Sequence, residues 1–110
     1  MKIEKKKFYI TRTDRKKSGR LVCYTDVKYG FVINDEFGID LRDDGFYRVT
    51  DIKTGAAFGG KERNVMQAYI MAKMIKNEHA KQLDSFCNIP EVKEMICEIE
   101  RKYKEDENGY

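Results

Sequence analysis

The apolar pattern of this chain changes its period once, near Arg63. Before that residue, short aromatic and β-branched runs alternate with glycine-containing turns, which is typical of strands. After it, apolar residues recur every three or four positions, as they do along a helix. A run of strands followed by a run of helices favours an α+β fold over a parallel α/β fold.

The N-terminal half predicts an antiparallel sheet of four or five strands. The segment 29–33 either extends the second strand past a bulge at Gly30 or forms a separate strand. We expect 39–41 to be a short edge strand, and 46–50 to pair with a short return strand that ends at Gly59-Gly60. The strands expected are 5–12, 21–25, 39–41, 46–50 and 56–58.

The C-terminal half predicts two helices packed on one face of that sheet. One long helix is expected over 63–86, with Ile75 and Leu83 buried. His79 falls on the same face, where a packed, hydrogen-bonded histidine is commoner than a catalytic one. Pro90 suits the first position of the second helix, since its missing N–H costs nothing there. That helix is expected to bury Val92, Met95, Ile96, Ile99 and Tyr103.

Length indicates a single domain, 1–110, with one modest core. No long apolar segment is present, so we expect neither a signal peptide nor a membrane span. Cys23, Cys87 and Cys97 are odd in number and form no CxxC, which argues against a disulfide framework or a zinc site. These features predict a reducing, cytoplasmic setting.

Charge is unevenly distributed, although the net charge is only +3. Residues 1–34 hold ten Lys/Arg against three Asp/Glu, whereas residues 87–110 hold four against seven. A hairpin with a cationic tip can follow phosphates, and aromatic residues among the cations can stack on bases. Alternatively, the lysines are solvated charges that protect an edge strand, and the aromatics are core. The basic candidates are Lys5, Lys7, Arg12, Arg15, Lys16, Lys17 and Arg20.

No catalytic, cofactor or metal motif is complete. Gly55–Lys61 nearly matches the phosphate-binding pattern GxxxxGK[ST], but Glu62 replaces the hydroxyl residue that would bind magnesium, and the preceding strand is expected to be antiparallel. His79 has no visible nucleophile, so we expect a protein that is not an enzyme and needs no cofactor or metal. Methionines of the long helix are expected in the core, the alternative being a protein-binding groove; they are Met66, Met71 and Met74.

Tyr47–Gly55, followed by Gly59–Arg63 and a helix, resembles a unit found in small proteins of phages and mobile elements, some of which are anti-CRISPR proteins. The resemblance implies a stoichiometric inhibitor that binds a CRISPR-type nuclease complex in the bacterial host cytoplasm and blocks its nucleic-acid site or its activation.

Many such inhibitors are acidic DNA mimics, whereas this chain is basic overall. Mimicry would therefore fall to the C-terminal helix or to a patch of acidic residues that otherwise look like solvated loop charges. These further partner-binding candidates are Asp35, Glu36, Asp40, Asp43 and Asp44. The leading hypothesis is thus an inhibitor, and the alternative is a small nucleic-acid-binding protein that uses the basic N-terminal hairpin.

Overall fold

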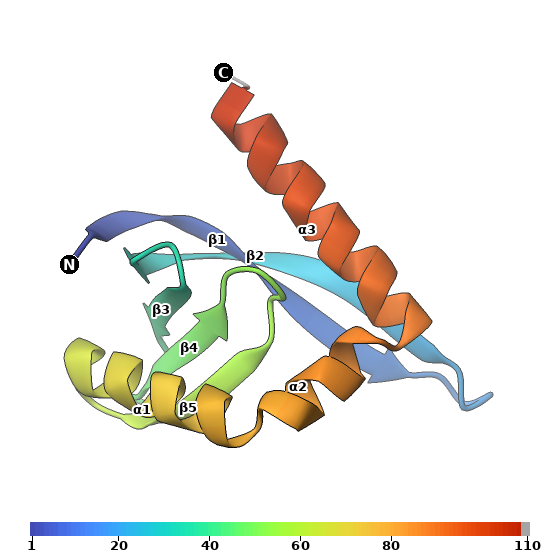
Figure 1. The fold of residues 1–110 in the computed structure, drawn as a ribbon, viewed down its shortest axis with the longest axis horizontal. Helices are drawn as coiled ribbons and strands as arrows, with labels where there is room; N and C mark the ends of the chain where they lie inside the picture. The colour runs from blue at the N-terminus through green and yellow to red at the C-terminus, as the bar shows by residue number, and fades with distance from the viewer. Residues whose placement is uncertain (109–110) are drawn as a thin grey trace.

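The computed structural model describes residues 1–108 and shows a five-stranded antiparallel sheet followed by three helices (Figure 1). The strands are ordered in space as they are in the sequence, which confirms the predicted α+β arrangement. The strands are β1 (Ile3–Arg15), β2 (Leu21–Ile33), β3 (Phe37–Leu41), β4 (Tyr47–Asp51) and β5 (Ala57–Glu62), and the helices are α1 (Val65–Glu78), α2 (Ala80–Cys87) and α3 (Pro90–Asn108).

β1 and β2 are longer than predicted and form a hairpin arm. Each strand has 13 residues, and their pairing is continuous, with Gly30 opposite Lys6. The segment 29–33 therefore extends β2, and no bulge occurs there. β3 pairs with β2 only through Phe31–Ile33 at the end of β2. The rest of the arm therefore extends beyond the other strands. Figure 1 shows the free end of the arm projecting at the right.

The sheet curls so that its inner face buries its own side chains. A Cβ on Gly38 of β3 would lie only 2.5 Å from the ring of Phe8 in β1, although β2 separates the two strands. The turn between β4 and β5 closes on β1, where the Thr11 N–H donates to the Gly55 carbonyl at 2.9 Å. The inner cluster consists of Phe8, Ile10 and Val32, with Ile52 and Tyr103 packed against it.

α1 packs on the face of the sheet that carries Phe37, whereas α3 lies beside β2 and reaches the inner cluster through Tyr103. Phe37 is fully buried in the main core, and its ring meets those of Phe58 and Tyr69 edge-on, at centroid distances of 6.2 and 5.9 Å. α1 begins after Asn64 because the Asn64 side chain accepts hydrogen bonds from the first free N–H groups of the helix. The main core contains Ile33, Phe37, Ile39, Val49, Phe58, Ala68, Tyr69 and Ala72.

Two strand predictions are wrong. β3 is not an edge strand, because it lies between β2 and β4. The return strand β5 does not end at Gly59-Gly60 but continues through both glycines to Glu62. Both have positive φ, which glycine adopts at little cost, and the pairing with β4 shifts register there. A bulge therefore replaces the predicted strand end.

The predicted long helix is also wrong, because it is divided into α1 and α2 at His79. His79 is exposed, so it is not a packed core residue. Ile75 and Leu83, predicted to be buried, are only half-buried at the margin of the main core. Met66 and Met74 are exposed rather than in the core, at 36% and 51%.

The second predicted helix is confirmed as α3, which begins at Pro90 and fully buries Val92 and Ile99. The other three residues predicted to be buried are only half-buried; they are Met95, Ile96 and Tyr103. α3 continues through Asn108, and residues 109–110 lie outside the described part. None of the helices within residues 1–108 has both the length and the apolar character needed to cross a bilayer.

Tyr103 is expected to make the free energy of unfolding fall at alkaline pH. Its hydroxyl accepts the Tyr9 backbone N–H at 2.9 Å, and burial raises the pKa of the phenol to about 12. An unfolded phenol ionises near pH 10, so this contribution is complete below pH 10 and is lost as pH rises to 12. We expect a loss of about 2–3 kcal/mol over that interval that Tyr103→Phe lacks.

Urea unfolding at pH 8, 10 and 12 measures this difference. Tyr29→Phe is the matched control, because Tyr29 is 63% exposed. Equal alkaline losses in the protein and in Tyr103→Phe would contradict the prediction.

Candidate partner-binding surface

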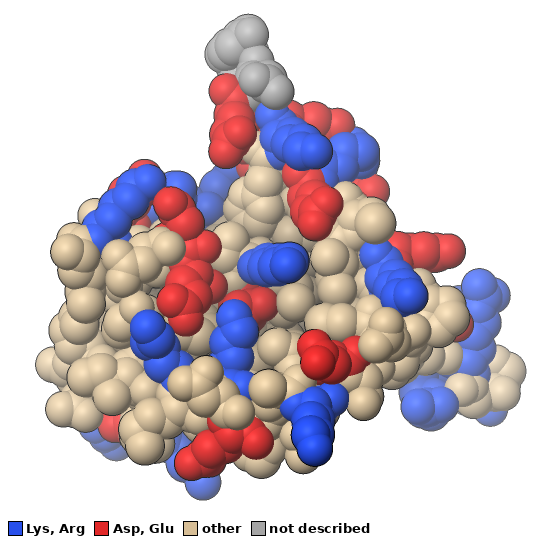
Figure 2. All heavy atoms as spheres, in the orientation of Figure 1, with Lys and Arg blue, Asp and Glu red and all other residues tan. Residues whose placement is uncertain are grey.

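The free end of the hairpin arm carries exposed cations. The turn is closed by the Gly19 N–H, which donates to the Lys16 carbonyl at 2.8 Å, and Arg15 donates to the Gly19 carbonyl at 2.8 Å. Within residues 1–108, none of the four cations at this end lies within ion-pair distance of a carboxylate: Arg15, Lys16, Lys17 and Arg20. Figure 2 shows basic side chains gathered at this end, at the right. We call Arg15, Lys16, Lys17 and Arg20 the hairpin tip.

One side of the tip faces acidic residues. Arg20 borders a groove between β2 and α3 that is lined by Glu91, Glu94 and Glu98. These glutamates recur every three or four residues, so they share one face of α3. The cationic field of the tip is therefore directed away from α3.

Lys5 and Lys7 do not join the tip. They lie toward the opposite end of β1, whose 13 residues span about 40 Å at about 3.3 Å per residue. The Lys7 ammonium pairs with Asp106 at 3.2 Å, and this hydrogen bond raises the pKa of Lys7. Lys5 lies over the ring of Phe31 at 5.8 Å. Lys5 and Lys7 thus form a surface separate from the tip, and within residues 1–108 the tip cations make no ion pair.

The aromatic residues of the basic front are also divided. Phe8 and Tyr9 are buried, as the edge-strand alternative expected. Tyr24 is 47% exposed and lies opposite Arg12 in the hairpin. Only Tyr24 among these three is available to stack on a partner.

The predicted acidic residues of the loop after β2 have cationic neighbours. Asp35 lies 3.1 Å from Lys2 and 3.7 Å from Lys6, and the hydrogen bond from Lys2 lowers the pKa of the Asp35 carboxyl. Glu36 lies 3.9 Å from Lys73. This part of the candidate acidic patch is therefore largely neutralised.

The acidic residues of β3 and the following turn are separated by their environment. Asp43 and Asp44 are exposed, and Asp44 pairs with Arg42 at 2.9 Å. Asp40 is not a solvated loop charge, because it lies within β3 and is only 8% exposed. The five predicted carboxylates thus form no continuous acidic face.

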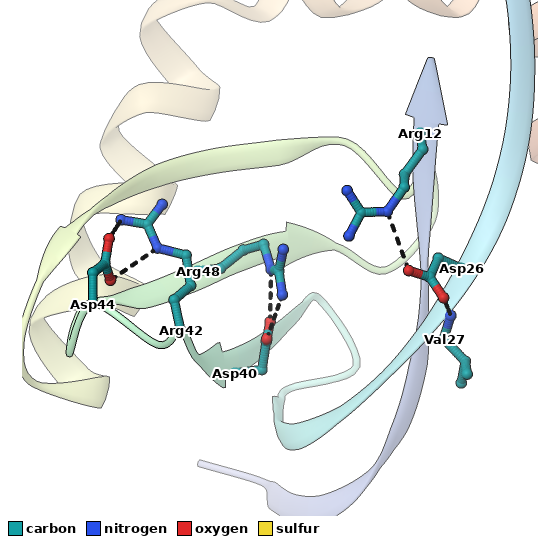
Figure 3. Close-up of polar contacts among 7 residues, drawn as sticks. All are labelled: Arg12, Asp26, Val27, Asp40, Arg42, Asp44 and Arg48. Carbon is teal, nitrogen blue, oxygen red and sulfur yellow. Dashed lines mark hydrogen bonds and ion pairs between the residues drawn. The ribbon is translucent and has the colours of Figure 1, made fainter. Parts of the chain in front are cut away.

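Asp40 belongs to a charged cluster between the β1–β2 arm and the β3–β4 pair, which we call the mouth (Figure 3). Its carboxylate accepts two hydrogen bonds from Arg48 of β4, at 3.0 and 2.6 Å. Arg12 donates through Nε to Asp26 at 3.1 Å. The mouth consists of Arg12, Asp26, Lys28, Asp40 and Arg48.

Each ion pair in the mouth shifts the pKa of one of its two groups. The pKa of Asp26 is lowered first by the backbone N–H of Val27 and then by Arg12. The pKa of Arg48 is raised mainly by its hydrogen bonds to Asp40, with a further contribution from Asp26. The influence of Asp26 on Arg48 shows that the two ion pairs are electrostatic neighbours.

Sequence reasoning missed Asp26, Lys28 and Arg48. A signal was present, because the short connection 42–46 places Asp40 directly opposite Arg48 in an antiparallel pair. Opposite charges at such positions interact across the strands. The contribution of the β1–β2 arm had no comparable signal, since it depends on how the sheet curls.

The remaining candidates add no chemistry. β4 and β5 are antiparallel, as expected, and this arrangement argues against a phosphate-binding loop at Gly55–Lys61. Among residues 1–108, no three or more His, Cys, Asp or Glu side chains are grouped so as to hold a metal ion. The three cysteines are free thiols.

No protein-family model, curated protein or solved structure matches this chain.

Proposed function

We propose that the protein is a non-enzymatic binding protein, a phage-type stoichiometric inhibitor that docks on a bacterial CRISPR-type nuclease complex through the hairpin tip. The observation that supports this proposal is the projecting arm, whose end presents cations away from the body of the molecule (Figures 1 and 2). A narrow, two-stranded arm can enter a groove that the body cannot. Its charges would also steer the encounter with an anionic site.

A nuclease complex suits this arm better than free nucleic acid does. Affinity for a free duplex grows with the number of phosphates neutralised, and the tip is small. The acidic face of α3 next to Arg20 would also repel a long backbone. A localised anionic site on a protein–nucleic acid complex avoids both difficulties, because the body of the inhibitor then contacts protein.

The alternative is a small nucleic-acid-binding protein. Tyr24 favours it, because an exposed aromatic ring next to Arg12 can stack on an unpaired base. The two functions differ in the partner that binds at physiological salt.

A charge-matched pair of variants tests the proposal. Combining Lys16→Ala, Lys17→Ala and Arg20→Ala should slow association with an assembled CRISPR nuclease complex by about tenfold at low salt, because peripheral charges act mainly on the association rate. The control combines Lys81→Ala, Lys93→Ala and Lys104→Ala, which removes the same charge from exposed positions on α2 and α3. Biosensor kinetics on a panel of such complexes, with a nuclease assay, measure both effects.

Labelled DNA and RNA oligonucleotides separate the alternatives. At about 150 mM salt we expect free nucleic acid to bind no more tightly than the non-specific range of about 10⁻⁴ to 10⁻⁶ M. Sub-micromolar binding that is lost in the tip variant and retained in the control would overturn the inhibitor proposal. Failure to bind any nuclease complex would also contradict it.

A further inference from the structure

Each of the two arginines of the mouth forms an ion pair with a carboxylate. Arg48 uses Nε and Nη2 to bind Asp40, which leaves its Nη1 without a hydrogen-bond partner among residues 1–108. Arg12 uses only Nε to bind Asp26, so both of its terminal nitrogens remain available within the same part of the chain. An arginine fixed in this way presents N–H donors in a defined direction.

The available ends of these arginines point into the same space. In Figure 3 they lie between the β1–β2 arm and the β3–β4 pair, and the guanidinium group of Arg12 extends toward that of Arg48. A hollow of about 610 Å³ is lined by Arg48 and Lys28 together with Arg42 and three carboxylates, and Arg12 is not among the residues that line it. Lys28 makes no ion pair with residues 1–108, so its ammonium adds a third cation.

Carboxylates also border this space and limit what it can bind. Asp26, Asp40 and Asp44 pair with Arg12, Arg48 and Arg42, so each pair carries little net charge and Lys28 supplies the positive charge of the mouth. Asp43 is exposed in the turn at the far side of the hollow. A compact anion held by the arginines avoids these groups better than an extended polyanion would.

The burial of the Asp40–Arg48 pair adds a separate reason to expect a ligand. The side chains are 9% and 22% exposed, so the pair is removed from most solvent. A buried ion pair usually stabilises a fold no better than well-packed apolar residues do. What it provides here is a guanidinium group whose orientation is fixed before any ligand arrives.

We propose that the mouth binds one phosphate group between the guanidinium ends of Arg12 and Arg48, with Lys28 as a third contact. A tetrahedral oxyanion offers oxygens in diverging directions, which matches donors arriving from the arm and from β4. The phosphate group belongs either to a small phosphate compound or to a nucleic-acid backbone. This site goes beyond the proposed function, since none of its residues lies in the hairpin tip.

Titration of the ¹⁵N-labelled full chain tests the site, with inorganic phosphate in one arm and a short oligothymidine in the other. Backbone amides of Arg12, Lys28 and Arg48 should shift and saturate. Arg12→Gln and Lys28→Gln should each weaken binding by about tenfold, because each removes a charged donor. Arg101→Gln is the control, since it removes an exposed arginine that pairs within α3.

The arms distinguish the source of the phosphate. Saturation by inorganic phosphate that also displaces the oligonucleotide supports a site for the group itself. Saturation by the oligonucleotide alone supports a backbone phosphodiester. Absence of any saturable shift in both arms overturns the proposal. The hairpin-tip variant should bind inorganic phosphate normally, so failure of one proposal leaves the other testable.

Arg48→Gln alone would leave Asp40 buried and unpaired, which strongly destabilises the fold. The double variant Asp40→Asn/Arg48→Gln keeps a polar pair, leaves the net charge unchanged and removes the fixed guanidinium group. A cooperative thermal transition confirms that it folds. It should lose the saturable shifts, and unchanged phosphate binding would overturn the proposal.

Discussion

Replacing Phe37 by alanine should lower the free energy of unfolding by about 3–5 kcal/mol, a large share of the total for a small domain. Phe37 is fully buried, and its ring contacts those of Phe58 and Tyr69. Alanine would forfeit the transfer free energy of the ring and leave a cavity between the sheet and α1. Neither side can collapse easily, because β3 is held between two strands.

Urea unfolding of three proteins measures this loss. Phe37→Leu fills more of the space and should cost less than Phe37→Ala. Ile70→Ala is the control on the outer face of α1, where Ile70 is 48% exposed, and it should change stability by no more than about 0.5 kcal/mol. A loss below about 1 kcal/mol for Phe37→Ala would show that α1 does not pack on β3 as described.

The order of strands and helices was predictable because it depends on local periodicity. Turn residues separate the strands, and the change of period near Arg63 marks the passage to helices. The position of β3 was not predictable in this way. Asp40 made that strand look like a solvated edge, whereas its carboxylate is neutralised by Arg48 on the next strand.

The break at His79 escaped prediction for a related reason. Leu83 in α2 packs at the margin of the same core as α1, so apolar spacing continues across the break. Periodicity records which residues face the core, and it does not record a single residue that leaves the helical conformation. His79 does so, with φ −111° and ψ 28°.

The two candidate surfaces differ in how visible they are in the sequence. The tip was predictable, because Lys16, Lys17 and Arg20 lie around one local turn and are exposed. The separation of Lys5 from the tip depends on strand length, which the pattern underestimated. The mouth depends on the curl of the sheet, which brings Arg12 and Arg48 to the same space.

Replacing Lys76 by methionine should cost about 3–5 kcal/mol, because it leaves a buried charge without its partner. Lys76 donates to Asp51 at 2.7 Å, and Asp51 is only 2% exposed. The other carboxylate oxygen accepts the Thr54 hydroxyl at 2.7 Å and the Thr54 N–H at 3.2 Å. Methionine retains the length needed to cover the ring of Phe37, which lies 5.4 Å from the ammonium group.

Replacing Asp51 should lower the free energy of unfolding by less than replacing Lys76 does. Comparing the two variants therefore tests whether the Asp51 charge is buried. In Asp51→Asn the amide oxygen can still accept from Thr54, and Lys76, whose side chain is 31% exposed, can reach water. We expect a loss of about 1.5–3 kcal/mol, the scale of a hydrogen bond to a charged group. The double variant Lys76→Met/Asp51→Asn should recover most of the loss seen in Lys76→Met, because no buried charge remains. A double-mutant cycle by urea unfolding measures the coupling. Additive losses, with the double variant less stable than either single variant, would show that the Asp51 carboxylate is not confined between α1 and the β4–β5 turn.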